Sequence, residues 1–156
     1  MSHGATEANE FELGTDGPSA ILVGIDDSVT SLRAASYAVG LARRQRARIV
    51  AVYVAPMAYA SAVSAGAGVV VAQEQAHNEV AASLQKRFED AAKELGISVT
   101  FIVAHGDAYR EIKRIADEAR VDAIVVGASA QAGHKLVGSL AVRLVRAGRW
   151  PVTVVP

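Results

Sequence analysis

Apolar residues in this chain gather in short runs that alternate with longer stretches, in which they recur every three or four positions. Runs of about four to eight apolar residues are typical of strands buried on both faces, and the wider spacing indicates amphipathic helices. A helix is predicted after each of the first four strands. The predicted strands are residues 20–25, 48–54, 97–104, 123–126 and 151–156.

Capping residues mark where these helices begin and end. Ser28 or Thr30 can cap the first helix and Asp107 the third, because their side-chain oxygens accept hydrogen bonds from the free N–H groups of a first turn. Gly96 and Gly148 end the second and fourth helices, since glycine readily adopts the left-handed conformation that follows a helix.

A long connection precedes the second helix. Residues 56–68 are rich in Ala, Gly and Ser and show no periodic pattern, so helical spacing begins only near residues 70–73. Long loops in compact domains often act as lids, and we expect a mobile loop of that kind here.

Strands that alternate with helices predict an α/β fold, an open parallel sheet with helices on both faces. The strand at residues 97–104 alternates apolar and polar residues in its first half, as expected of an edge strand with one wet face. With the strand order 3-2-1-4-5, the order reverses between the first and fourth strands. Ligands bind at such a switch point, beyond the carboxyl ends of the strands. Asp26 and Gly127 would then face each other across the crevice.

The connection between the fourth strand and the fourth helix is a candidate anion site. Gly127 ends a buried strand, and Gly138 and Ser139 open the helix after ten intervening residues. A helix N-terminus that follows a parallel strand can hold an anion through its free N–H groups. Ser139 could simply cap its helix, or it could offer its hydroxyl and backbone N–H to a phosphate.

Three other residues at strand ends have more than one interpretation. Asp26 is either a turn residue or an acceptor for ribose hydroxyls, and we favour ligand contact. Val54 is either part of the core or a residue whose backbone reads an adenine edge. Gly106, after the third strand, is interpreted as a plain strand-to-helix turn.

Composition indicates one domain with a core of Val, Ala, Ile and Leu. The chain has 156 residues, 51% of them hydrophobic, and no cysteine, which excludes disulfides and is consistent with a reducing cytoplasm. No apolar run approaches the roughly 20 residues of a membrane span, and the N-terminus lacks the pattern of a signal peptide. We therefore expect a cytoplasmic protein that does not enter a membrane.

The formal net charge is zero, but the charges are unevenly spread. Residues 1–18 contain four acidic and no basic side chains, so the remaining chain carries a charge of +4. We expect residues 1–18 to be a disordered acidic tail and residues 19–156 to form the domain. After Asp122 every charged residue is basic, and these residues form either a solvated helix face or a positive rim for an anionic ligand. They are Lys135, Arg143, Arg146 and Arg149.

Several well-known site motifs are absent from the sequence. There is no GxxxxGK[ST] loop, and no GxGxxG turn follows the first strand. Asp26 and Asp27 suggest the acidic pair of receiver domains, but the third and fifth strands end without the Asp and Lys that such domains require. The histidines have no metal-ligand spacing, and neither a nucleophile elbow nor a nucleic-acid motif is present.

The chain from about residue 20 to residue 156 resembles the universal stress protein family. The motifs that carry the resemblance are ILVGIDDS, TSLRAASYA, IVAVYVAP, HGD, DAIVVGAS and GSLAVRLVRAGRWPVTVVP. None is decisive alone, but their order and spacing together are specific. The resemblance implies an adenine nucleotide alpha hydrolase-like fold and a homodimer paired through the C-terminal strand. It also implies, for many members, binding of ATP, AMP or cyclic AMP, with Mg²⁺ as a companion of ATP.

The resemblance assigns ligand contacts to individual residues. Asp26 matches the aspartate that contacts ribose or adenine, and Val54 matches the residue whose main chain meets adenine. The implied set of nucleotide-binding residues is Gly24, Ile25, Asp26, Val54, Val126, Gly127, Ser129, Ala130, Gly133, Gly138, Ser139 and Leu140.

The phosphate loop departs from the family pattern. Nucleotide-binding members have G-x2-G-x9-G-[ST], whereas Ala130 stands in place of the second glycine, and only residues 131–137 separate it from Gly138. A methyl group resists positive φ and keeps the backbone away from a phosphate. The shorter loop resembles the family branch that does not bind ATP, although a shifted alignment puts Gly133 in the missing glycine's place.

Three functions stay open on this basis. We favour an adenine-nucleotide-binding regulator of the stress response that acts on an unidentified protein partner. The first alternative is a homodimeric interaction protein with a vestigial pocket that binds no nucleotide. The second is a slow ATPase, which is weaker because the sequence contains no evident general base or metal-ligand set. No catalytic or metal-binding residue is predicted.

Overall fold

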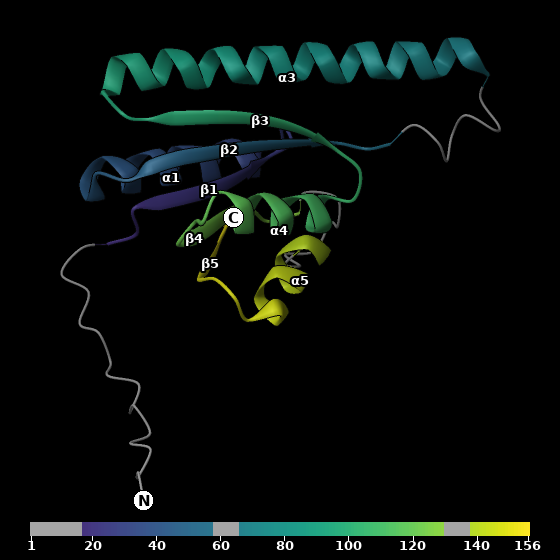
Figure 1. The fold of residues 1–156 in the computed structure, drawn as a ribbon. Helices are drawn as coiled ribbons and strands as arrows, with labels where there is room; N and C mark the ends of the chain where they lie inside the picture. Colours follow the sequence, from purple (N-terminus) through teal and green to yellow (C-terminus); the bar gives the residue numbers. More distant parts are fainter. Residues whose placement is uncertain (1–16, 58–65, 130–137) are drawn as a thin grey trace, which may run out of the picture.

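The computed structural model of the chain describes residues 17–57, 66–129 and 138–156 (Figure 1). Most of the predicted acidic tail and of the predicted loop at residues 56–68 lies outside this described part. The described elements, in chain order, are β1 (Ala20–Ile25), α1 (Val29–Gln45), β2 (Arg48–Ala55), α3 (Ala67–Leu95), β3 (Val99–His105), α4 (Ala108–Glu118), β4 (Ala123–Gly127), α5 (Ser139–Ala147) and β5 (Val152–Val155).

The described strands form one parallel sheet in the order β3-β2-β1-β4-β5. The predicted α/β class, the open parallel sheet and the strand order are therefore confirmed. β3 lies at one edge, as its alternating pattern predicted, and β5 lies at the other. The order reverses between β1 and β4, which pair through Ile21 with Ala123 and Val23 with Val125.

Each face of the sheet is covered by a pair of helices. Ile21 and Val23 of β1 pack into a core that includes buried residues of α1 and α3, such as Ala38 and Leu84. The intervening Leu22 packs into a second core with residues of α4 and α5. Side chains of a strand point alternately to its two faces, so one continuous apolar run fills both cores.

The longest helix, α3, has 29 residues but buries side chains mainly in its second half. Its buried residues are Ala81, Leu84 and Phe88, whereas Val69 and Val71 in the first turns are exposed. Figure 1 shows the first half of α3 reaching beyond the end of the sheet, on the side where β2 also ends. The first half of α3 therefore lies near the carboxyl ends of the strands.

The starts of two elements differ from the predicted starts by two residues or more. α3 begins at Ala67 rather than near residue 70, because Gly66, with a φ of 76°, turns the chain into the helix. β3 begins at Val99 rather than at residue 97, because the Ile97 N–H donates to the Ala92 carbonyl and belongs to the end of α3. The predicted caps Asp107, Gly96 and Gly148 are confirmed.

Candidate functional site

A cavity of about 730 Å³ opens at the carboxyl ends of the strands. The ends of β1, β2 and β4 form its floor, and the beginnings of α1, α4 and α5 and part of α3 form its walls. It therefore lies at the switch point between β1 and β4, where a parallel sheet of this kind holds its ligands.

The structure brings the described members of the sequence-predicted site to this one cavity. Ala130 and Gly133 lie outside the described residues, so the predictions for them stay predictions. The members that line the cavity are Gly24, Ile25, Asp26, Val54, Val126, Gly127, Ser129, Gly138, Ser139 and Leu140.

Local hydrogen bonds shape the turn between β1 and α1. The Ser28 backbone N–H donates to Asp26 Oδ1 over 3.0 Å, and the Asp26 N–H donates to Ser31 Oγ over 3.3 Å. Ser28 is the cap of α1, because its hydroxyl accepts from the Ser31 N–H over 3.2 Å. Asp26 is thus a turn residue, and since its side chain is also exposed, its carboxylate stays accessible from the cavity.

These hydrogen bonds also set the charge of Asp26. Partial burial raises the pKa of its carboxyl group, but the hydrogen bonds from Ser28 and Ser31 outweigh this effect, so the pKa lies below its ordinary value. The carboxylate is ionised at neutral pH and presents a negatively charged acceptor to the cavity.

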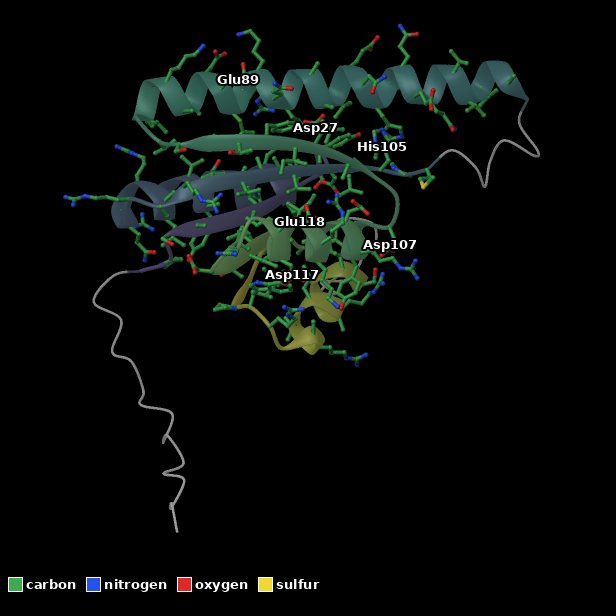
Figure 2. All side chains as sticks on the ribbon, viewed as in Figure 1. Asp27, Glu89, His105, Asp107, Asp117 and Glu118 are labelled. Carbon is green, nitrogen blue, oxygen red and sulfur yellow. The ribbon has the colours of Figure 1, made fainter. Side chains whose placement is uncertain are left out.

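The neighbouring Asp27 has a different orientation. Its φ of 64° is left-handed, a conformation that Asp tolerates better than most residues, and it lets the chain turn from β1 into α1. The Asp27 carboxylate lies 3.9 Å from the guanidinium of Arg87 on α3. Figure 2 shows Asp27 between α3 and the strands. The two adjacent carboxylates therefore have different surroundings.

The first turn of α1 packs directly on the end of β4. A Cβ atom at Gly127 would lie 2.6 Å from the backbone nitrogen of Ser31 and 2.6 Å from the carbonyl carbon of Thr30. Only glycine fits this position without displacement of the backbone. The Thr30 hydroxyl donates to the Ala128 carbonyl over 2.6 Å and so fixes the start of the predicted phosphate loop.

The two ends of that loop meet at the cavity. Gly138 and Ser129 are so close that a Cβ atom at Gly138 would lie 2.7 Å from the Ser129 Cβ. Gly138 is the N-cap of α5 and provides no side-chain cap, so the interpretation of Ser139 as the cap is wrong. Ser139, Leu140 and Ala141 form the first turn and line the cavity, and the N–H groups of a first turn have no partner within the helix. This end of the cavity suits an anion.

The basic residues after Asp122 do not form a positive rim around the cavity in the described part of the chain. Arg143 pairs with Asp107 over 3.1 Å and lies 4.2 Å from the centre of the Tyr109 ring. Arg149 pairs with Asp117 over 2.8 Å. Asp107 is the N-cap of α4 and Asp117 lies on α4, and both are labelled in Figure 2, so these arginines belong to a solvated helix surface. Lys135 lies outside the described residues.

Sequence reasoning missed a polar pair on the α3 side of the cavity. Tyr53 on β2 and His77 on α3 both line it, and their Oη and Nδ1 atoms are 2.8 Å apart. His77 precedes Ala81, Leu84 and Phe88 at helical spacing, which could have placed it on the inner side of α3. The other cavity residues absent from the predicted set are four polar residues from the turn after β1 and the first turn of α1, and several apolar residues. They are Asp27, Ser28, Thr30, Ser31, Val52, Ala76, Val80, Ala108, Ile112, Ala128 and Ala141.

Within the described ranges, no group of three or more His, Cys, Asp or Glu side chains could hold a metal ion. The same ranges contain no helix with the length and apolar character needed to cross a membrane.

Comparisons with known proteins match both the sequence and the fold. Universal stress protein YxiE of Bacillus subtilis is 33% identical over 144 residues, which cover 86% of this chain and 97% of that protein. A universal stress protein solved in complex with cAMP superimposes with a TM-score of 0.66 at 23% identity, covering 89% of this chain and 97% of its own. A universal stress protein family protein from Arabidopsis thaliana with AMP bound gives a TM-score of 0.64 at 17% identity, covering 88% and 91%.

The similarity extends over the whole described domain. The solved neighbours share the adenine nucleotide alpha hydrolase-like arrangement of the sheet. The model of the Universal stress protein family matches residues 19–156. The chain therefore belongs to the universal stress protein family.

Proposed function

We propose that this protein binds an adenine nucleotide, ATP, AMP or cyclic AMP, in the cavity between Asp26 and Gly127 and acts as a regulatory module in the stress response. The proposal rests on one observation. The ionised carboxylate of Asp26 and the N-terminus of α5, which has no side-chain cap, line the same cavity. Two structural neighbours were solved with cAMP and with AMP, which supports the same ligand class.

The cavity residues suit the parts of an adenine nucleotide. The Asp26 carboxylate can accept hydrogen bonds from ribose hydroxyls, as a charged acceptor does strongly. β1 ends at Ile25, which pairs with Tyr53, so β2 continues past its neighbour and leaves Val54 uncovered on that side. The Val54 backbone is then available to a base. The first turn of α5 can hold phosphate oxygens.

A magnesium ion that accompanies ATP would be held chiefly by the phosphates and by water. The described residues do not supply a dedicated set of ligands for it. We propose that the protein is a binding module rather than an enzyme. The highest activity that we propose for it is slow hydrolysis of ATP. A cytoplasmic location is part of the proposal and agrees with the lack of cysteine.

A second function has its own supporting observation. β5 pairs only with β4 among the described strands, and all four of its residues are partly exposed. A strand with an unpaired edge can pair with another chain. We propose that two copies associate through β5 and that an unidentified protein partner recognises the dimer, with or without nucleotide.

Calorimetric titration of the full chain with ATP, ADP, AMP and cyclic AMP tests the first function. We expect saturable heat with at least one of them, and a melting temperature that rises with its concentration by mass action. Absence of heat and of any melting shift with all four would overturn nucleotide binding and favour the interaction protein. The oligomeric state, measured by sedimentation, tests the second function independently.

A further inference from the structure

We infer that the α3 side of the cavity recognises the base of the nucleotide, with His77 as the contacting residue and Tyr53 as the residue that positions its imidazole. This inference rests on the proposed function, because it assigns a base-reading wall to the same cavity. Tyr53 comes from β2 and His77 from α3, and no other imidazole is among the cavity-lining residues that the structure describes.

The Tyr53 hydroxyl has one clear partner. Tyr53 is only 5% exposed, and its Oη lies 2.8 Å from His77 Nδ1. A buried hydroxyl without a hydrogen bond is costly, so this contact holds the imidazole in place. Burial, together with the negative charges of Asp26 and Asp27, raises the pKa of Tyr53, so its hydroxyl keeps its proton.

In the proposed arrangement the Tyr53 hydroxyl donates to His77 Nδ1, although either atom can be the donor in this contact. When the Tyr53 hydroxyl donates to Nδ1, the neutral imidazole carries its proton on Nε2. Nε2 has no hydrogen-bond partner in the described structure, and His77 is half-buried in the cavity wall. His77 Nε2–H can therefore donate a hydrogen bond to a ligand in the cavity.

The surroundings of this donor suit a flat, uncharged ring. Ala76 and Val80 line the cavity on the same helix, and Val54 lines it from β2. The carboxylates of Asp26 and Asp27 act on Tyr53, so the same place is unfavourable for a polyphosphate. The anion-binding turn of α5 belongs to the opposite helix layer. A nucleotide that spans the cavity would thus place its base at α3 and its phosphates at α5.

A purine provides the acceptor that this donor needs. Adenine carries ring nitrogens with lone pairs, such as N7 on one edge and N3 on the other. We assign His77 Nε2–H as the donor to one ring nitrogen of the purine, between apolar side chains that cover its faces.

Calorimetry with two ligands separates base contact from phosphate contact. His77→Phe keeps a flat ring but removes the N–H donor. The affinities for adenosine and for ATP should therefore fall by the same factor, about five- to tenfold. His77→Gln, which retains an N–H donor, should recover part of the loss. His105→Phe is the matched control, because His105 ends β3 (Figure 2) and is not among the described residues that line the cavity, so its replacement should leave both affinities unchanged.

Purine analogues identify the contacted atom. Among 1-deaza-, 3-deaza- and 7-deazaadenosine, the analogue that lacks the contacted nitrogen should bind wild type and His77→Phe equally, because the hydrogen bond is already missing. If His77→Phe weakens ATP but not adenosine, if it weakens neither, or if all three analogues still show its full effect, the assignment to the base is wrong. If wild type binds no nucleotide or nucleoside at all, it is instead the proposed function that fails.

The positioning role of Tyr53 has a spectroscopic test. In the unliganded protein at a pH of about 8.5, ¹⁵N spectra should show His77 with hydrogen on Nε2. Tyr53→Phe should shift the spectrum toward a mixture of tautomers and weaken adenosine binding. A purely structural role for Tyr53 would leave the tautomer unchanged. A wild-type spectrum with hydrogen on Nδ1 would overturn the assigned donor.

Discussion

The Thr30 hydroxyl donates a 2.6 Å hydrogen bond to the Ala128 carbonyl and thereby joins the first turn of α1 to the loop that follows β4. The two residues are 98 positions apart in sequence and meet at the switch point of the sheet. Because this carbonyl begins the predicted phosphate loop, the contact holds one end of that loop against the turn that carries Asp26.

Replacement of Thr30 by valine tests this contact. Thr30→Val keeps the shape of the side chain but leaves the Ala128 carbonyl without its donor, so we expect the free energy of unfolding to fall by about 1 kcal/mol. Urea unfolding measures the change. Ser36→Ala is the control, because the Ser36 hydroxyl bonds only to the Leu32 carbonyl on the exposed side of the same helix, and its loss should change stability little. Equal effects of the two variants would contradict a special role for Thr30.

Two glycines in the chain should respond to alanine in opposite directions. Gly127→Ala places a methyl group 2.6 Å from backbone atoms of Thr30 and Ser31, which cannot move without shifting α1. Overpacking of this kind costs about 1–3 kcal/mol. Gly40 lies inside α1, where the nearest atom to a new methyl is the flexible end of Arg44 at 3.5 Å. Gly40→Ala should therefore stabilise the protein by about 0.5–1 kcal/mol. Thermal and urea unfolding of both variants would show whether the signs differ.

Local patterns in the sequence predict much of the fold. The apolar runs fill both faces of a parallel strand, and this is why β1, β2 and β4 could be predicted together with the layers around them. The placement of Asp26 opposite Gly127 needed only one further rule, that ligand sites of such sheets lie where the strand order reverses. The close approach of Gly127 to Thr30 was not predictable, because it depends on how closely α1 packs against β4.

The contact between Tyr53 and His77 could not be predicted for a related reason. The two residues are 24 positions apart, and the segment between them has no periodic pattern, so nothing local sets the register of α3 against β2. The left-handed Asp27 was also missed, since an Asp in a turn can adopt several conformations. For Ser139 both roles were open, and the backbone at Gly138 decided that the cap lies one residue earlier.

Asp122 links folding stability to pH. Its Oδ2 accepts hydrogen bonds from the hydroxyl and N–H of Ser19 and from the N–H of Ala20, over 2.8, 2.9 and 2.9 Å. The hydrogen bond from the Ser19 hydroxyl is the main cause that lowers the pKa of Asp122, and the two backbone N–H groups add to it. A carboxyl group whose pKa is lower in the folded state stabilises the fold above its unfolded pKa of about 4. This contribution is lost as the pH falls through the folded pKa.

We expect Asp122→Asn to lower the free energy of unfolding at pH 7 by about 1 kcal/mol, a modest value because Asp122 is exposed. The difference from wild type should shrink below a pH of about 4, and urea unfolding at several pH values would reveal it. Asp90→Asn is the control, since Asp90 forms only an exposed pair with Lys86 one helical turn away, and no measurable change is expected. If the difference in free energy of unfolding between Asp122→Asn and wild type stayed constant down to a pH of about 3, the charge of Asp122 would not be what stabilises the contact with Ser19 and Ala20.

The adjacent carboxylates of Asp26 and Asp27 allow a matched test of the ligand site. Asp26→Asn keeps an oxygen that can accept from the Ser28 N–H, so the turn should survive, but it removes the charged acceptor proposed for the ribose. We expect affinity for adenosine and for ATP to fall about tenfold or more, the range for a hydrogen bond to a charged group.

Asp27→Asn changes the neighbouring carboxylate in the same way. Asn tolerates the left-handed backbone at this position. Asp27 also lines the cavity, but its carboxylate pairs with Arg87 at 3.9 Å and no ligand atom is proposed for it. The affinity should therefore change less than about twofold, because an exposed ion pair of this length contributes little. Calorimetry of both variants at one pH decides the matter. Were Asp27→Asn to weaken binding as much as Asp26→Asn, general negative charge in the cavity, rather than a specific ribose contact, would be responsible.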